Sequence, residues 1–368
     1  MKNKRLLIFH PTIAPYRIDF FNDLYGAFET RICLEYWNLK DQKFDYSRIY
    51  SRFSFEPQYI PCHHVLGLFN FIKKLIKDFN PDIVLVNEFH YITIIVLLLR
   101  LFLKRSYKVV CICDDSYNMV AEGNDFSLGH KLGRKLLVPF LDDLILVEPN
   151  TVGWYQQHYG KGLYFPIIKN EEIARKEYEI VLPLSKKTII DCKINGKCVY
   201  LFVGRLVDIK NVKTVINAFS MLPQGENILV VVGDGPEKEN LMNLAQELHS
   251  NVIFTGRLEG ENLYQWYNIA DIFVLASYLE PFGAVTNEAL LAGCYSLISK
   301  KAGSQCLIVD NVNGFTFSPN NVQELFNKMV AVRDKLSFGH QLVSIKKSLM
   351  LIDYKVIMSK LISTLQSM

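Results

Sequence analysis

The sequence predicts a two-domain α/β protein in which each domain has a parallel sheet covered by helices. Three observations lead to this fold class. The chain has 368 residues, more than one hydrophobic core normally supports. Half of its residues are hydrophobic and 21% are charged, a composition typical of a folded globular chain. Short apolar runs alternate with amphipathic segments, and this alternation indicates parallel strands connected by helices.

The predicted elements of the first half begin with a strand at 5–9 and a helix at 18–27. Further strands are predicted at 31–36, 82–86, 108–113 and 143–147. Residues 92–103 are nearly all apolar, but this run is well short of the roughly 20 residues that a membrane span needs. We therefore expect a helix buried in the first domain.

The middle and the end of the chain carry weaker patterns. Residues 169–196 have mixed charge, a proline and no sustained period, so we expect a linker with one short helix there. Residues 338–368 have a helical pattern. The sequence therefore predicts a helical tail after the second domain.

Charge and cysteine content exclude several classes of protein. A net charge of +4 is too mild for a dedicated nucleic-acid binder, so we expect no nucleic-acid partner. The 8 cysteines form no Cys-x-x-Cys pair and no signal peptide precedes them, which favours a reducing, cytoplasmic compartment. Cys62, His63 and His64 are adjacent and thus point apart, and no second ligand pair follows at zinc-like spacing. We expect no metal.

The most informative segment, 277–293, is a loop that leads into a helix carrying two carboxylates, Glu280 and Glu288. Pro281 and Gly283 permit a tight approach, and the first amides of the helix are unpaired donors suited to a diphosphate. Two carboxylates on this segment are natural acceptors for sugar hydroxyls. The alternative is a solvated acidic pair, which is common at a helix start.

A second segment supports a sugar-nucleotide site. The apolar run 199–203 predicts a strand, and the loop after it contains Arg205 and Lys210. Ligands of open α/β sheets bind at the carboxyl ends of strands. Either cation alone would be an ordinary surface charge, but both in one such loop suggest a clamp for a leaving diphosphate.

With these signatures, residues 197–327 resemble the nucleotide-binding half of the retaining GT-B glycosyltransferases of family four, the glycosyl transferases group 1. The family order is kept by six elements: Gly204-Arg205 with Lys210, 232–236, 254–257, 270–274, Glu280 to Glu288, and Ala302-Gly303 with Asn313-Gly314. Gly233 and Gly235 lack the third glycine of a dinucleotide fingerprint, so we interpret them as a turn before a helix.

The resemblance implies roles for particular residues. Arg205 and Lys210 would bind the donor diphosphate, Glu280 the sugar hydroxyls and Glu288 the ribose. The backbone of two short segments would contact phosphate and base, respectively: Phe282, Gly283, Ala284 and Val285, and Gly256, Arg257 and Leu258. Together with Asp114, the residues Arg205, Lys210 and Glu280 are the candidates for catalysis.

The resemblance also implies an architecture and a chemistry. Two Rossmann-like domains would face each other across a cleft: an acceptor-binding domain, 1–168 with a returning helix at 346–368, and a nucleotide-sugar domain, 169–345. No Asp-x-Asp motif is present to hold a metal against the diphosphate. We therefore expect no cofactor, with cationic side chains and amides in place of a metal.

The acceptor side is expected from loops that follow strands of the first domain. Many members of the family have two glycines after the first strand, whereas this chain has Ala14-Pro15 followed by Tyr16 and Arg17. This resembles a Pro-Tyr-Arg branch found among enzymes of bacterial surface polysaccharides. Glu88, His90, Asp114 and Asp115 also follow predicted strand ends. Asp114 is interpreted either as an acceptor-side group or as a cap of the next turn.

The resulting hypothesis is a retaining glycosyltransferase that moves a hexose from a nucleotide donor such as a UDP- or GDP-hexose to a glycan hydroxyl. We expect this acceptor to be lipid-linked, at the inner face of the cell membrane. A helix at 69–79 could rest on anionic lipid with its lysines, or could dock on the sheet as an ordinary helix. Two alternatives remain at this point: a non-catalytic sugar-nucleotide-binding subunit of another transferase, and a sugar-nucleotide epimerase.

Overall fold

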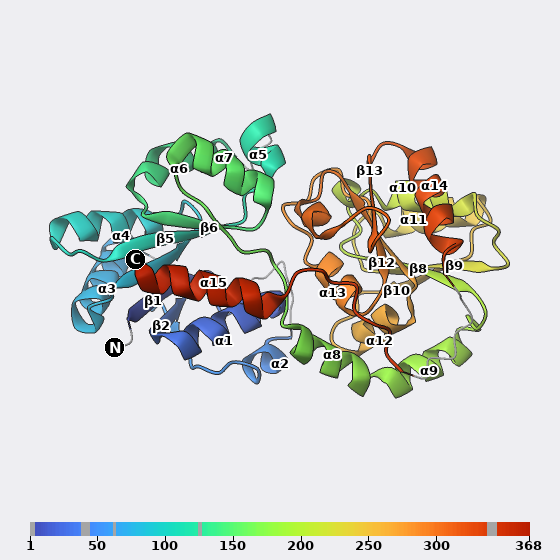
Figure 1. Cartoon of the computed structure of the whole chain (residues 1–368), viewed down its shortest axis with the longest axis horizontal. Coiled ribbons are helices and arrows are strands. Elements are labelled where there is room, and N and C mark those ends of the chain that lie inside the picture. The colour runs from blue at the N-terminus through green and yellow to red at the C-terminus, as the bar shows by residue number, and fades with distance from the viewer. Residues whose placement is uncertain (1–3, 38–44, 62–63, 124–126, 337–343) are drawn as a thin grey trace. The chain divides into compact units, whose positions relative to one another are not determined.

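The computed structural model describes residues 4–37, 45–61, 64–123, 127–336 and 344–368. These residues form two compact units, Met1–Ile167 with Tyr354–Met368, and Ile168–Asp353. Each unit contains a parallel β-sheet with helices packed against it (Figure 1). The expected fold class, two Rossmann-like α/β domains with a final helix in the first, is confirmed.

The first unit has a sheet of the order β3-β2-β1-β4-β5-β6-β7. Its strands are β1 (Arg5–His10), β2 (Glu29–Leu34), β3 (Gln58–Tyr59), β4 (Ile83–Asn87), β5 (Lys108–Cys113), β6 (Asp143–Leu146) and β7 (Leu163–Tyr164). Its helices are α1 (Ile18–Ala27), α2 (Tyr46–Tyr50), α3 (Val65–Phe79), α4 (Tyr91–Phe102), α5 (Tyr117–Glu122), α6 (Leu128–Leu137), α7 (Pro149–Tyr159) and α15 (Tyr354–Ser367), with short 3-10 turns η1 (Pro15–Arg17) and η2 (Val138–Phe140).

The second unit has a sheet of the order β10-β9-β8-β11-β12-β13. Its strands are β8 (Cys198–Val203), β9 (Asn227–Val232), β10 (Val252–Gly256), β11 (Ile272–Leu275), β12 (Tyr295–Ser299) and β13 (Gly314–Phe317). Its helices are α8 (Glu171–Ile180), α9 (Leu182–Asp191), α10 (Val212–Ser220), α11 (Lys238–Glu247), α12 (Glu261–Ile269), α13 (Val285–Leu291) and α14 (Val322–Arg333), with the turns η3 (Asp208–Lys210) and η4 (Gly303–Leu307).

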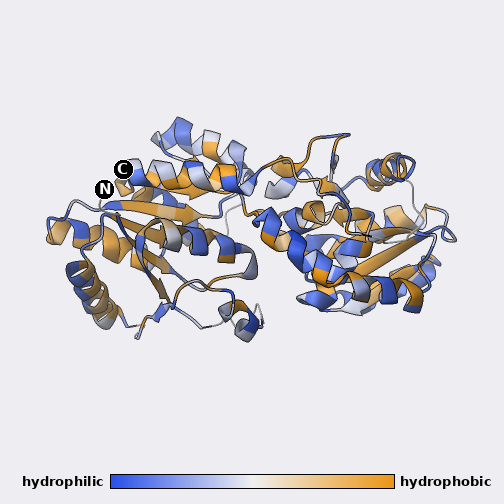
Figure 2. Ribbon diagram, turned by 60° about the horizontal axis from the view of Figure 1, so that its bottom comes forward, coloured by the Kyte–Doolittle hydropathy of each residue, from blue (hydrophilic) through white to orange (hydrophobic). Residues whose placement is uncertain are grey.

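The central strands of both sheets are continuously apolar because helices cover them on both faces. Every residue of β8 and β9 is buried. The strands appear as orange ribbons inside each unit (Figure 2). Side chains of β8 and β11 enter two cores, one on each side of the second sheet. These strands therefore hold their carboxyl-terminal loops on a rigid frame.

The segment 169–196, expected as a linker with one short helix where the second domain begins, packs as part of the second unit. It forms two helices, α8 and α9, rather than one short helix. Ala174, Tyr178 and Ile189 are buried in the core on one face of the second sheet. A proline at the start of α9 is compatible with a helix, since the first turn needs no amide donor there.

The expected helical tail at 338–368 is helical only from Tyr354; residues 337–343 lie outside the described part. The preceding residues pack on the second unit, where Lys346 Nζ donates to the carbonyl of Ala270 and Leu349 N to that of Leu290. The chain therefore returns to the first unit at Tyr354, later than residue 346, where the returning helix was expected to begin. There α15 packs on α1, and Tyr354 Oη donates to Asp23 Oδ2 at 2.8 Å (Figure 1).

The structure decides between the two interpretations of the helix expected at 69–79. Ile72, Leu75, Ile76 and Phe79 of α3 are buried in the core of the first unit, so α3 is docked on the sheet and its apolar face is not available to lipid. His64 caps α3 by accepting a hydrogen bond from Gly67 N, whereas Cys62 and His63 lie outside the described residues. Among the described residues, no helix combines the length and apolarity that crossing a membrane requires.

Candidate functional site

The candidate donor site lies where the strand order of the second sheet reverses. β8 and β11 are hydrogen-bonded neighbours although about 70 residues separate them in the sequence. From this pair, β9 and β10 extend in one direction and β12 and β13 in the other. Ligands of open parallel sheets bind at such a switch point. Arg205 and Lys210 follow β8, and Glu280 follows β11, so the structure places all three at this point.

Lys210 and Glu280 form an ion pair between the two loops. Lys210 Nζ contacts Glu280 Oε2, and both side chains are largely shielded from solvent. Tyr278 N donates to the carbonyl of Ile209 at 2.9 Å, which ties the same loops together through their backbones. Arg205, in the same loop after β8 as Lys210, is exposed. The arrangement provides two cations and a carboxylate at one edge of the sheet.

Asn211 anchors the loop that carries the two cations. Its backbone is in the left-handed region, with φ of 52°, a conformation that asparagine tolerates better than most residues. Its buried Nδ2 donates to the carbonyls of Ala276 and Pro319 at 3.1 and 2.8 Å. These bonds hold the end of η3 against β11 and therefore fix the backbone beside Lys210.

Glycines allow the loops after β11 and β12 to touch. A Cβ on Gly303 would lie 2.1 Å from the carbonyl oxygen of Pro281, so only glycine fits. Gly283 has φ of 92°, and a Cβ there would meet Leu275 Cδ2 at 2.7 Å. Ser304 N donates to the carbonyl of Phe282 at 2.7 Å. The loop around Phe282 is therefore held by direct backbone contact.

The residues expected to cradle phosphate precede α13 immediately. Phe282 is buried and acts as an anchor, while Gly283, Ala284 and Val285 lead into the helix. The hydrogen bonds of this turn begin with Thr286 N, which donates to the carbonyl of Gly283 at 3.0 Å. The amides of residues 283–285 thus come before the first bonded turn of the helix.

Glu288 lies at the first turn of α13 and is held by two groups that sequence reasoning missed. Lys169 Nζ lies 2.7 Å from Glu288 Oε1, and Tyr267 Oη donates to Oε2 at 3.0 Å. Burial opposes the charge on Lys169, but the neighbouring Glu288 carboxylate raises its pKa well above the ordinary value. Lys169 was assigned to a linker because nothing in the local sequence distinguishes it from a surface lysine.

The segment expected to contact a base, Gly256, Arg257 and Leu258, follows β10 at the edge of the sheet. Gly256 has φ of 75° at the end of the strand. Arg257 pairs with Glu259 of its own loop, Nε to Oε1 3.1 Å. Gly233 N donates to the carbonyl of Gly256 at 2.9 Å, which joins this loop to the one after β9. These residues share the edge of Arg205 but lie beyond β9.

Gly233 and Gly235 form the turn that was expected, and their role is close backbone approach. A Cβ on Gly233 would lie 1.8 Å from the carbonyl oxygen of Gly204, and one on Gly235 would lie 2.3 Å from that of Leu206. Leu206 N donates to the carbonyl of Asp234 at 2.9 Å. The turn therefore supports the loop of Arg205 from the side of β9.

In the first unit, the structure brings three of the expected acceptor-side residues together. Arg17 Nη2 lies 2.5 Å from Asp114 Oδ1, and Asp114 N donates to Glu88 Oε1 at 2.8 Å. Burial, followed by the charges of Asp114 and Asp115, raises the pKa of Glu88 to about 8. These side chains follow β1, β4 and β5, which are neighbours in the sheet. Asp114 therefore forms an ion pair, which neither sequence interpretation had predicted.

Tyr16 and His90 lie on the borders of this group. Tyr16 belongs to η1, next to Arg17, and interacts with other residues of the chain. His90 precedes α4 and is exposed. The structure therefore joins Arg17, Glu88 and Asp114, and it shows no direct contact between His90 and them within the described residues.

Asp115 is the centre of a buried polar network. His130 Nε2 lies 2.7 Å from Asp115 Oδ1, while Arg134 Nη1 and Tyr155 Oη donate to Oδ2 at 2.9 and 2.5 Å. Burial opposes the charge on Asp115, but the hydrogen bonds from His130 and Tyr155 hold its pKa below the ordinary value. The network fixes α6 and α7 to the end of β5.

Four ligand atoms in this area, from Glu88, Cys113, Asp115 and His130, lie within 4.8 Å of one another, close enough to bind a metal ion. The Arg134 guanidinium and the Tyr155 hydroxyl already donate hydrogen bonds to the carboxylate of Asp115. Burial raises the pKa of the Cys113 thiol, which disfavours the thiolate that binds a metal. We therefore interpret these groups as a hydrogen-bonded network.

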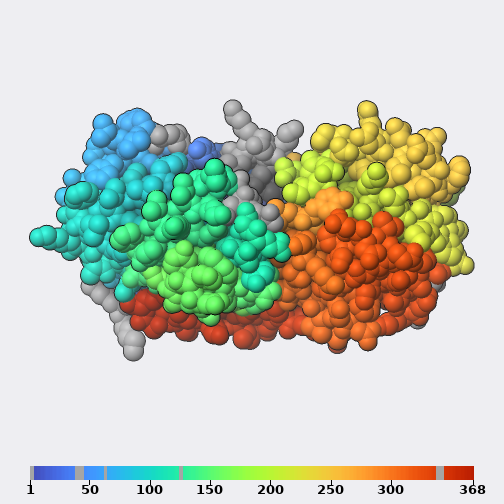
Figure 3. All heavy atoms as spheres, turned by 90° about the horizontal axis from the view of Figure 1, so that it is seen from above, coloured from blue at the N-terminus to red at the C-terminus, as the bar shows by residue number. Residues whose placement is uncertain are grey.

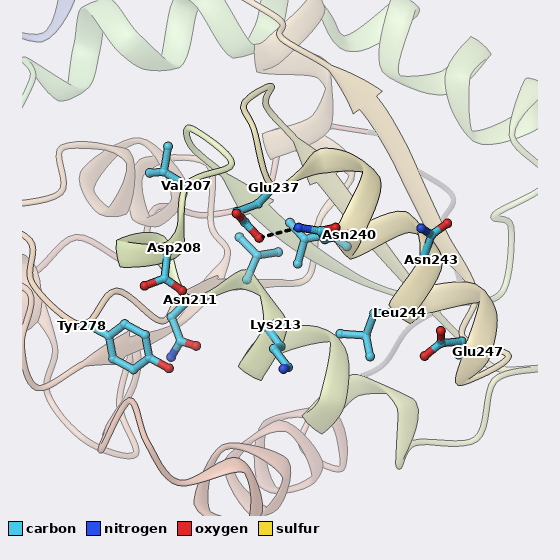
Figure 4. A pocket seen from close by; sticks show the side chains of 12 residues that line it. Val207, Asp208, Asn211, Lys213, Glu237, Asn240, Asn243, Leu244, Glu247 and Tyr278 are labelled. Carbon is cyan, nitrogen blue, oxygen red and sulfur yellow. Dashed lines mark hydrogen bonds between the residues drawn. The ribbon is translucent and has the colours of Figure 1, made fainter.

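A groove of about 470 Å³ lies between α10 and α11 of the second unit (Figure 4). Its wall includes Asp208, Asn211 and Tyr278, which belong to the loops of the switch point, and also Lys213 of α10 and Glu247 of α11. Arg205, Lys210, Glu280 and Glu288 do not line it. The groove is therefore distinct from the candidate donor site.

Comparisons with known proteins agree with this fold. Residues 191–334 match the family model described as Glycosyl transferases group 1. An uncharacterized glycosyltransferase of Methanocaldococcus jannaschii is 36% identical over 33% of this chain and 32% of its own length. N-acetylgalactosamine-N,N'-diacetylbacillosaminyl-diphospho-undecaprenol 4-alpha-N-acetylgalactosaminyltransferase of Campylobacter jejuni is 28% identical over 72% of this chain and 71% of its own length.

Among solved structures, HepE (Alr3699) of Anabaena in complex with UDP resembles the whole chain. The TM-score is 0.76 at 16% identity, with 99% of this chain and 100% of that chain covered. This likeness shows the GT-B fold, and the family match at 191–334 includes the loops of Arg205 and Glu280. Residues 191–334 are thus similar to the group 1 glycosyltransferases, and the fold of the chain is that of the GT-B proteins.

Proposed function

We propose that the protein transfers a hexose from a nucleoside-diphosphate sugar to a glycan hydroxyl, with retention of anomeric configuration and without a metal ion. Arg205 and Lys210 bind the diphosphate of the donor, Glu280 binds hydroxyls of the sugar, and Glu288 binds the ribose. The backbone at 282–285 contacts phosphate and that at 256–258 the base.

The observation that carries the proposal is the Lys210–Glu280 pair at the switch point of the second sheet. A cation and a carboxylate side by side match the two ends of the scissile bond, which are a phosphate and a hydroxylated sugar ring. As the bond breaks, negative charge grows on the leaving phosphate, and fixed cations act most strongly where charge develops. Lys210 and the neighbouring Arg205 supply that stabilisation in place of a metal.

Retention is proposed to follow from a same-face displacement assisted by the departing phosphate. The transition state of glycosyl transfer is oxocarbenium-like, with positive charge on the sugar. Glu280 favours this charge as well as orienting hydroxyls. In the first unit, Arg17 holds Asp114 in a fixed position, and Asp114 is the proposed polar group on the acceptor side.

Two similar proteins suggest the substrates. The name of the Campylobacter jejuni relative specifies a diphospho-undecaprenol-linked acceptor, and HepE of Anabaena was solved with UDP and with UDP-glucose. We accordingly propose a uridine nucleotide donor and a lipid-linked glycan acceptor of cell-surface polysaccharide synthesis, met at the inner face of the cell membrane by a peripherally bound enzyme.

A thermal-shift panel of UDP-, GDP- and ADP-sugars, measured in EDTA, tests the donor site. A ligand at a hundred times its dissociation constant stabilises the folded state by about 2.7 kcal/mol, so one nucleotide class should raise the melting temperature clearly. The absence of any shift would contradict the proposal. Release of nucleoside diphosphate from the bound donor then separates a transferase from a non-catalytic binding subunit, and loss of turnover in EDTA would contradict metal independence.

A further inference from the structure

Helix α6 has an inside-out distribution of polarity. Arg134 is buried and His130 is mostly buried, because both reach Asp115, whereas Lys131 and Lys135 are exposed. Three leucines on the opposite side face solvent instead: Leu128 is 81% exposed, Leu132 58% and Leu136 63%. Spacings of four residues place these leucines in one stripe along the helix. Burial within the chain therefore does not explain why this stripe is apolar.

Helix α4 continues the apolar surface. The helix was expected to be buried, and one side of it is, but Ile94, Leu98, Leu101 and Phe102 are exposed on the other. A Cβ on Gly133 of α6 would lie 2.8 Å from Phe89 Cβ, just before α4, and Arg100 of α4 donates to the carbonyl of Phe140, just after α6. The chain at each end of α4 therefore contacts α6 or the turn that follows it.

The surface made of the exposed apolar side chains of α4 and α6 together with Phe140 lies on two helices whose charged side chains are all basic. Neither helix contains an aspartate or a glutamate. Lys131 and Lys135 are exposed along the leucine stripe, and Lys104 is exposed just beyond α4. The cyan and green atoms of this part of the first unit lie side by side in Figure 3. An anionic partner is electrostatically complementary to such a surface.

We propose that the α4–α6 surface docks on the anionic surface of a lipid bilayer. A contiguous apolar patch of large side chains indicates a binding site rather than ordinary surface composition. Leucine and phenylalanine side chains bordered by lysines, on helices that contain no acidic residue, match the boundary between headgroups and acyl chains. The inference rests on the proposed function in one respect, namely that a lipid-linked acceptor must be met at a membrane.

The test is co-sedimentation of the full chain with vesicles of phosphatidylcholine alone and of phosphatidylcholine with about one third phosphatidylglycerol. The wild-type chain is expected to bind the anionic vesicles, and added salt should weaken this binding. L132S/L136S should reduce the bound fraction roughly tenfold or more, because two apolar anchors are lost. K131Q/K135Q should weaken binding to the anionic vesicles and leave binding to the phosphatidylcholine vesicles unchanged.

I180S/I190S is the matched control, since both isoleucines are exposed on α8 and α9 of the second unit. Vesicle binding by L132S/L136S equal to that of the control would overturn the inference. So would a wild-type chain that ignores anionic vesicles, or one that forms a dimer abolished by L132S/L136S, because a second copy would then cover the surface. Circular dichroism and the melting temperature of each variant show that the fold is intact.

The nucleotide-sugar melting shift, recorded on the same variants, keeps the two proposals apart. Unchanged nucleotide binding in L132S/L136S with lost vesicle binding supports the docking surface. The opposite result is also informative: no nucleotide sugar stabilises the wild-type chain, yet its vesicle binding still depends on the leucines. That result would contradict the proposed function and leave the docking surface intact.

Discussion

Lys169 Nζ lies 2.7 Å from Glu288 Oε1, and the two side chains are 3% and 12% exposed. The segment that enters the second unit and the helix that follows the switch-point loop are thereby joined by a buried ion pair. Lys169 N also donates to Asn287 Oδ1 at 2.9 Å. Glu288 therefore holds a fixed position before any ligand arrives.

Removing one partner of this pair should destabilise the protein. Lys169→Met leaves the Glu288 carboxylate buried without its counter-charge, which should lower the free energy of unfolding by about 3–5 kcal/mol. Urea denaturation at neutral pH measures this loss. Lys186→Met, at an exposed position of α9, is the control and should change stability by less than about 0.5 kcal/mol. Equal stability of the two variants would show that the pair does not hold α13.

The cations at the switch point should affect turnover more than folding. Arg205→Ala and Lys210→Ala should each lower kcat by roughly 10²–10³, because each removes a charge that stabilises the leaving phosphate. Initial rates at saturating donor measure this effect. Lys213→Ala removes an exposed lysine three residues from Lys210 and serves as the control. Near-wild-type turnover of the Arg205 variant would refute the assigned role.

Lys210 and Glu280 should also be coupled energetically. Because their side chains are in contact, the effects of Lys210→Ala and Glu280→Ala on unfolding should not add. A double-mutant cycle should give an interaction energy of about 0.5–3 kcal/mol. Additive effects would mean that the pair contributes nothing in the ligand-free chain.

The raised pKa of Glu88 predicts a specific pH dependence of stability. Burial, with the charges of Asp114 and Asp115, raises its pKa from 4.5 to about 8. Between these two pH values the folded state keeps a proton on Glu88 that the unfolded state releases. The stability that this proton contributes is therefore fully present below the pKa of Glu88 in the unfolded chain. It is lost as the pH rises through the pKa of Glu88 in the folded chain.

Glu88→Gln removes this titration and keeps an oxygen that can accept from Asp114 N. Relative to the wild type, the variant should gain on the order of 1–3 kcal/mol between about pH 5 and pH 8. Urea denaturation across this range measures the gain. Glu56→Gln changes an exposed glutamate and should follow the wild-type profile. Parallel profiles for all three proteins would contradict the assignment.

Gly303 should tolerate no side chain. The Cβ of Gly303→Ala would lie 2.1 Å from the Pro281 carbonyl oxygen, so the loops after β11 and β12 must separate. Overpacking of this kind costs about 1–3 kcal/mol, and the melting shift caused by a nucleotide sugar should also shrink. Gly225→Ala, which meets no atom within 4 Å, is the control. A Gly303 variant as stable as that control would show that the contact can relax.

Local sequence patterns were sufficient for much of the fold and of the donor site. Apolar runs identified strands such as β5 and β8, because residues buried on both faces must be apolar over the whole strand. The loops of Arg205 and Glu280 followed from their places after such runs. The helix at 18–27 was also recovered as α1, while β2 begins at Glu29, ahead of the predicted strand, because its first residues are exposed and polar.

Only the tertiary structure showed which distant residues meet. The partners of Glu288 and of Asp115 are separated from them by long stretches of chain, and a lysine, a histidine or an arginine has the same local signature on a surface as in a buried pair. The same limit applied to the helices: the apolar face of α3 enters the core, whereas the leucines of α6 face solvent because Asp115 draws the polar side of that helix inward. Periodicity determines that a helix has two faces, and the packing of neighbouring elements decides which of them is covered.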